Sequence, residues 1–133
     1  MKILLVIVAL LIVAVIVTYV MVFALMRRML RAGARIAVEA AWQQVKTHQN
    51  PVLRIVEADK ILDEALRLLG YSGTLGDKLK AAGPRFTNLN ALWAAHRLRN
   101  RLVHELNAKP ADREVDEAVT AFHKALTDLG ARL

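Results

Sequence analysis

The sequence contains no cysteine, only three prolines and few aromatic residues. Without cysteine there is no disulfide framework, no thiolate nucleophile and no zinc knuckle, so the fold must be held together by its core. Aromatic residues make up 5% of the 133 residues and hydrophobic residues 56%, so the apolar content is largely aliphatic. This composition excludes a disordered chain, and it makes a membrane segment the first feature to look for.

Acidic residues are absent from the first 35 positions, which hold five basic residues. Residues 36–133 carry 14 basic and 12 acidic side chains, so the net charge of +7 for the chain falls to +2 for this part. A balance of +2 is small for a domain that must hold a polyanion, because affinity for nucleic acid depends on neutralised phosphates. Most of the positive charge therefore indicates a membrane boundary.

A long uncharged run occupies the amino-terminal end, from Ile3 to Met26. As a helix, these 24 residues would measure about 36 Å, which is enough to cross a hydrocarbon core of about 30 Å. The sequence predicts a transmembrane anchor over residues 1–27. A cleaved signal peptide is the alternative, since residues 22–24 loosely fit a cleavage site, but signal peptides have apolar cores of only about 7–15 residues.

The basic residues flanking this run predict its orientation. Only Lys2 and the amino terminus precede the run, whereas four arginines follow it within nine residues: Arg27, Arg28, Arg31 and Arg35. Positive charge favours the cytoplasmic side, so we expect a single-pass protein of the cell membrane with a cytoplasmic carboxy-terminal domain. The arginine cluster either only fixes this topology or also binds membrane lipid with anionic headgroups.

The rest of the chain shows helical periodicity and no period-two alternation, which predicts an all-α protein. Residues 28–50 are expected to form a juxtamembrane helical stalk with a weak apolar stripe of Ile36, Trp42 and Val45. Residues 51–133 are expected to form a helical domain with three substantial helices and a short one. Capping and breaking residues place these helices at 51–69, 74–82, 88 to Leu106 and 111–129, with Asn50, Thr74 and Asn88 as N-caps and Asp77 completing a capping box.

Two charged residues fall on helix faces that are otherwise apolar. Arg99 lies within the arc of Leu98 and Leu102, and Asp59 lies on the core arc of the helix that starts at Pro51. Since buried charges are nearly always paired, we expect an inter-helix ion pair between Asp59 and Arg99 that fixes the register of the two helices. Asp63 lies nearly on the same arc and is the alternative partner.

A polar stripe runs along another flank of the helix that contains Arg99. His96, Asn100 and His104 recur every four residues, and Arg97 and Arg101 border them. The simplest interpretation is a solvated helix face. However, arginine, asparagine and histidine together can bind a phosphate and move a proton near neutral pH without a metal.

The run from Arg99 through Asn100 to His104 resembles the signature of the HEPN superfamily (higher eukaryotes and prokaryotes nucleotide-binding). That signature is an arginine, a polar residue that is often asparagine, and a histidine after four to six intervening positions. The resemblance covers about residues 51–129. The chain is similar in particular to small bacterial proteins in which one membrane anchor precedes such a domain. It implies an antiparallel helical bundle that forms a homodimer with two motifs meeting at the interface.

The resemblance also implies a metal-independent endoribonuclease. By motif position His104 would be the acid–base group, Arg99 would stabilise charge on the phosphorane, and Asn100 would orient the phosphate or the histidine. The neighbouring residues expected to bind RNA are His96, Arg97 and Arg101. No cofactor and no metal are expected; His104-Glu105 begins like a zinc-protease motif, but Ala108 replaces its second histidine.

The sequence departs from the family pattern beside the motif. Glu105 follows His104 where many toxin relatives have tyrosine, and a carboxylate there disfavours the approach of RNA. An Arg99 that is paired with Asp59 would also lose its free charge. The alternatives are therefore a non-catalytic interaction or nucleotide-binding module, or a structural subunit of a membrane complex, with RNA or a protein as the partner.

Overall fold

The computed structural model describes residues 1–27, 29–105 and 107–133, with the backbone alone for residues 23–27. Its regular elements are α1 (Lys2–Arg27), α2 (Ala32–Thr47), α3 (Pro51–Leu68), α4 (Leu75–Ala82), the 3₁₀ turn Gly83–Arg85, α5 (Leu89–His104) and α6 (Asp112–Asp128). The prediction of an all-α chain is thus confirmed over the described ranges. Arg28 of the basic cluster and the predicted helix end at Leu106 lie outside them.

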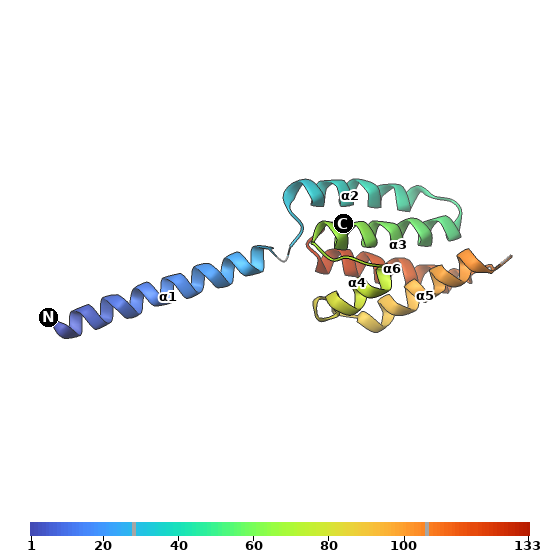
Figure 1. Cartoon of the computed structure of the whole chain (residues 1–133). Helices are drawn as coiled ribbons and strands as arrows, with labels where there is room; N and C mark the ends of the chain where they lie inside the picture. The colour runs from blue at the N-terminus through green and yellow to red at the C-terminus, as the bar shows by residue number, and fades with distance from the viewer. Residues whose placement is uncertain (28, 106) are drawn as a thin grey trace.

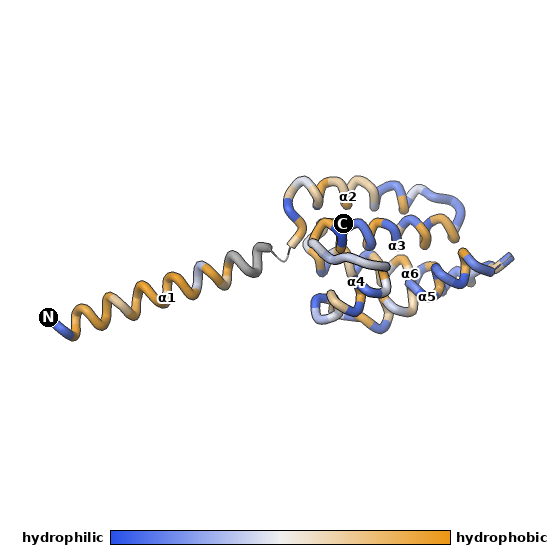
Figure 2. Tube along the Cα trace, in the orientation of Figure 1, coloured by the Kyte–Doolittle hydropathy of each residue, from blue (hydrophilic) through white to orange (hydrophobic). Residues whose placement is uncertain are grey.

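Helix α1 projects from the remaining helices, and Figure 2 shows its almost continuously apolar course. Its segment Lys2–Val22 is long and apolar enough to cross a membrane, and none of it is buried inside the protein. Within the described ranges, this apolar surface is not covered by the other helices. This is the arrangement that a membrane anchor requires.

The other helices form a bundle around α3, which packs against α2, α5 and α6 (Figure 1). Neighbours in sequence run in opposite directions, α2 against α3 and α5 against α6, while α4 and the 3₁₀ turn make the crossing from α3 to α5. The core is one apolar cluster, and its largest fully buried side chains are Trp42, Ile55, Leu62, Leu66, Leu79, Leu92, Phe122, Leu126 and Leu129.

The predicted capping residues begin their helices as expected. The side chain of Asn50 accepts a hydrogen bond from the backbone N–H of Val52 at 2.9 Å, and Asn88 caps α5 in the same way. Thr74 and Asp77 form a reciprocal capping box at the start of α4. These contacts are local in sequence and satisfy backbone donors that have no partner inside the helix.

Residues expected as a stalk are helical in α2, but this helix packs along α3 as part of the bundle. Val38, Trp42 and Val45 are buried, whereas Ile36, which we expected on the apolar stripe, is 62% exposed. Positions 36 and 38 are separated by about 200° around a helix, so both cannot face the same neighbour. The stripe of α2 that enters the core is therefore the one that contains Val38.

The segment after α1 is fastened to the end of α6. The N–H of Leu30 donates a hydrogen bond to the carbonyl of Leu129 at 3.0 Å, and the side chain of Leu30 is buried in the core. Gly130 lies against Met29, so closely that an added Cβ would be 3.0 Å from its terminal methyl group. The bundle thus begins only two residues after the end of α1 at Arg27.

Candidate functional site

Four polar side chains meet where α3 faces α5, and we call Asp59, His96, Arg99 and Asn100 the α3–α5 cluster. The carboxylate of Asp59 is central and only 3% of this residue is exposed. Its Oδ1 lies 2.7 Å from Nδ1 of His96, and its Oδ2 lies 3.1 Å from Nε of Arg99. The ion pair expected between Asp59 and Arg99 is present, and one buried carboxylate ties α3 to α5 through two partners.

Asn100 closes the other side of the cluster. Nη1 of Arg99 donates to Oδ1 of Asn100 at 3.0 Å, so the amide nitrogen of Asn100 is left to face Nε2 of His96 at 3.3 Å. An amide nitrogen only donates, so Nε2 must accept and Nδ1 must carry the proton that is shared with Asp59. The hydrogen-bond pattern therefore assigns His96 the neutral tautomer, with both ring nitrogens engaged.

The guanidinium of Arg99 is partly open to solvent, since 26% of the side chain is exposed. Its Nε lies close to Asp59, but the alignment is too poor for a hydrogen bond. The attraction between these two groups is therefore that of two charges, and the hydrogen bond of the guanidinium goes to Asn100. A phosphate that approached Arg99 would have to compete with a carboxylate already in place.

The cluster opens onto a groove of about 530 Å³, the polar groove, which is bordered by residues at the start of α4. Its charged lining residues are Asp59, Lys60, Asp63, Glu64 and Arg99. With His96 neutral, they sum to one negative charge. Asp63, the alternative partner for Arg99, instead lies 2.9 Å from the buried ammonium group of Lys78. Each of these lining charges is in an ion pair, with Glu57, Arg67 and Lys78 as the partners from outside the lining, so the groove offers no net charge to a polyanion.

Glu64 at the rim of the polar groove is paired with Arg67, which lies outside the lining. A hydrogen bond from Arg67 lowers the pKa of Glu64 below its usual value. Both nitrogens of that bidentate contact lie 2.6 Å from the carboxylate oxygens. This rim residue therefore brings its own counter-charge at neutral pH.

His104 lies apart from the cluster. It is the last residue of α5, it is exposed, and no ion pair or hydrogen bond joins its side chain to another described residue. Each step of four residues turns about 40° around a helix, so the stripe of His96, Asn100 and His104 turns away from α3 as it proceeds. Of the three motif residues, Arg99 and Asn100 are brought together and His104 is not.

The residues expected to bind RNA also separate. His96 belongs to the α3–α5 cluster, Arg97 is exposed without an ion-pair partner in the described part of the chain, and Arg101 pairs with Glu114 at 2.7 Å. The four-residue spacing that predicts the polar stripe does not show that His96 faces Asp59. A carboxylate has two oxygens, and here each serves a different residue of α5.

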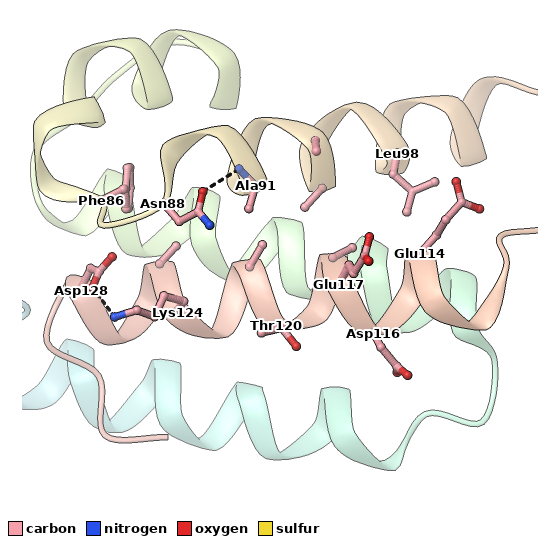
Figure 3. Close-up of a pocket in the computed structure, with 15 residues that line it drawn as sticks. Phe86, Asn88, Ala91, Leu98, Glu114, Asp116, Glu117, Thr120, Lys124 and Asp128 are labelled. Atoms are coloured by element: carbon pink, nitrogen blue, oxygen red, sulfur yellow. Dashed lines mark hydrogen bonds and ion pairs between the residues drawn. The ribbon is translucent and has the colours of Figure 1, made fainter.

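A second groove, between α5 and α6, has a volume of about 640 Å³ and was not expected. Figure 3 shows short side chains of the two helices facing each other across it, with Leu98 and Glu114 at one end and the Lys124–Asp128 pair at the other. Six alanines form much of the wall: Ala91, Ala94, Ala95, Ala118, Ala121 and Ala125. Alanines at matching positions of two facing helices were the available signal in the sequence. The groove thus has a largely apolar wall, and its lining also includes the acidic residues Glu114, Asp116, Glu117 and Asp128.

No set of three His, Asp or Glu side chains gathers as a metal site would require in the described ranges. The sequence matches no model of a protein family, and neither a curated protein nor a solved structure is detectably similar to it. The function must therefore be argued from the geometry of the chain itself.

Proposed function

We propose that the chain is a single-pass protein of the cell membrane with its helical domain on the cytoplasmic side. The support is the unburied apolar surface of α1 and the excess of arginine directly after it. Lys109, in the connection between α5 and α6, is exposed. A membrane-impermeant maleimide should therefore label Lys109→Cys in cells only after lysis, and labelling of intact cells would reverse the topology.

We further propose that the domain is a HEPN-like bundle that works as a non-catalytic interaction module. The observation that carries this proposal is the engagement of Arg99 and Asn100 inside the α3–α5 cluster. A nuclease of the expected kind needs an arginine that is free to stabilise the negative charge of the phosphorane. Moving Arg99 away would leave the buried carboxylate of Asp59 without its cation. Breaking such a buried pair typically lowers the stability of the fold by about 3–5 kcal/mol.

The charge of the polar groove supports the same proposal. RNA binding draws its affinity from neutralised phosphates, and the charged side chains of this groove are already engaged in ion pairs. His104 lies outside it, so no described histidine with a free ring nitrogen faces Arg99. In this proposal the cluster sets the register of α3 and α5, and the outer surfaces of the bundle contact the partner.

The test is an RNA-cleavage assay with the full chain in nanodiscs and EDTA. We expect no turnover, and we expect Arg99→Ala to lower the melting temperature because it removes the cation beside Asp59. Cleavage that is lost in His104→Ala at unchanged melting temperature would overturn the proposal.

A metal-independent endoribonuclease is the second candidate, and the exposed outer face of α5 favours it. His104 and Arg97 are both exposed there and have no partner among the described residues, so a second copy could meet them without breaking the cluster. This candidate requires a homodimer formed through α5, with His104 as the acid–base group and Arg97 as the phosphate contact. It expects Arg97→Ala to lose cleavage and leave the fold intact, and a monomer in sedimentation experiments would exclude it.

A further inference from the structure

The attachment of the bundle to α1 limits how far one end of the bundle can lie from the membrane. Met29 follows Arg27 by two residues, which span at most about 7–8 Å of extended chain. Leu30 is buried and hydrogen bonded to Leu129, so this short tether cannot lengthen without opening the core. The start of α2 and the end of α6 therefore lie beside the bilayer whenever α1 is inserted.

This end of the bundle is basic. Arg31 and Arg132 are exposed, and neither has an ion-pair partner in the described ranges. Glu39 is the nearby acid, and its carboxylate already lies 3.5 Å from Arg35 and accepts the backbone N–H of Arg132 at 2.8 Å. The last contact also holds the carboxy-terminal end of the chain beside α2 (Figure 1). Two cationic side chains are thus left for an external anion.

The same end exposes apolar side chains. Met29 and Ile36 are among the exposed large hydrophobic residues of the bundle, and Ile36 follows the start of α2 by only four residues, about 6 Å of helix. Arginines that flank exposed apolar side chains are typical of surfaces that rest on a bilayer, where the apolar groups enter the boundary between headgroups and acyl chains. We call Met29, Arg31, Ile36 and Arg132 the tether-end patch.

A second copy of the chain is a poorer occupant of this patch. A two-fold contact would bring two copies of this patch together, and the patch contains no acidic side chain that could pair with its arginines. Anionic lipid headgroups supply the missing negative charge, because they attract basic side chains that lie near the membrane surface.

We infer that the tether-end patch docks on anionic lipid headgroups, with Met29 and Ile36 entering the interface and Arg31 and Arg132 binding lipid phosphates. The inference rests on the proposed insertion of α1, and it adds that the folded bundle is itself held against the bilayer. Its polar groove and the outer face of α5 would then be presented at a fixed height above the membrane.

The test uses the full chain in nanodiscs of phosphatidylcholine with or without phosphatidylglycerol. Because the chain has no cysteine, Ile36→Cys provides a unique site for an environment-sensitive fluorophore. The matched control is Lys109→Cys, which precedes the first residue of α6 and so lies about 25 Å along that helix from its docked end. We expect an aqueous quencher to act several-fold less on the label at position 36 than at position 109 in anionic discs, and we expect Arg31→Gln with Arg132→Gln to abolish the difference.

Co-fractionation of the chain with the discs separates the possible failures. A chain that is retained in the discs but is quenched equally at both positions would overturn the docking and leave the anchor intact. A chain that is not retained would overturn both. Protection of the label at position 36 that is the same in neutral discs would overturn the role of anionic lipid. Protection that grows with the number of chains per disc would also overturn it and would indicate self-association.

Discussion

Nδ1 of His96 lies 2.7 Å from Oδ1 of Asp59, which joins the middle of α5 to the middle of α3 at a buried carboxylate. Arg99 approaches the other oxygen of the same carboxylate. The carboxylate of Asp59 thus contacts both the neutral imidazole of His96 and the guanidinium of Arg99, which are three positions apart on α5. A shift of α3 against α5 by one residue would separate all three groups, so the arrangement favours the observed register of the two helices.

Replacing Asp59 with alanine should destabilise the bundle strongly. The change leaves Arg99 without its counter-charge and His96 without its acceptor, and removal of one partner of a buried pair typically costs about 3–5 kcal/mol. Urea unfolding followed by the fluorescence of the two tryptophans, Trp42 and Trp93, measures the loss. The matched control is Asp116→Ala, because Asp116 is exposed and has no ion pair with the described residues; its effect should stay within about 0.5 kcal/mol. Equal losses in the two variants would show that the cluster is not structural.

The two histidines of the polar stripe should behave differently when each is changed to alanine. His96→Ala removes a hydrogen bond to a charged, buried acceptor, so we expect a loss of about 1.5–3 kcal/mol. His104→Ala removes an exposed side chain at the end of α5 and should change stability by less than about 0.5 kcal/mol. Thermal unfolding of both variants provides the comparison. A larger effect at position 104 would mean that its imidazole is held by a partner, such as a second copy.

Local signals in the sequence were sufficient to place the helices that carry the cluster. The N-cap residues bind backbone groups only two or three positions away, and each begins a helix where the sequence predicts one. They are Asn50 followed by Pro51, Thr74 with Asp77, and Asn88. The pairing of Asp59 with Arg99 was also predictable, because a charge on an apolar helix face must find its opposite on the neighbouring one.

Contacts between distant segments could not be predicted in the same way. Nothing near Leu30 signals its hydrogen bond to Leu129, because that contact depends on how the bundle closes. The sharing of Asp59 between His96 and Arg99 depends on the distance between α3 and α5, which helical periodicity does not give. For the same reason the burial of α2 against α3, in place of a free stalk, followed only from the packed structure.

The two glycines near the tether should respond in opposite directions to alanine. Gly130 has a φ of +101°, a conformation that costs an L-residue about 1–2 kcal/mol, and the new Cβ would press on Met29. Gly33 is exposed in the first turns of α2, and a Cβ there meets nothing within 4 Å, so alanine should stabilise by up to about 1 kcal/mol. Urea unfolding of both variants in the same nanodiscs measures the difference. Stabilisation by Gly130→Ala would contradict the clamp between Met29 and the end of α6.

The capping box of α4 should give the bundle an acid-sensitive component of stability. Hydrogen bonds from the hydroxyl and the backbone N–H of Thr74 lower the pKa of Asp77 below its usual 3.8. A group whose pKa is lower in the folded state stabilises the fold above the unfolded-state pKa, and this contribution is lost as the pH falls through the folded-state pKa. Asp77→Ala should therefore unfold at lower urea than the parent at neutral pH, and the gap should narrow below about pH 4. Thr74→Ala should show the same pH dependence because it removes the hydroxyl that donates to Asp77. A difference in urea midpoint between Asp77→Ala and the parent that stays constant down to about pH 2 would show that the charge of Asp77 contributes nothing to stability.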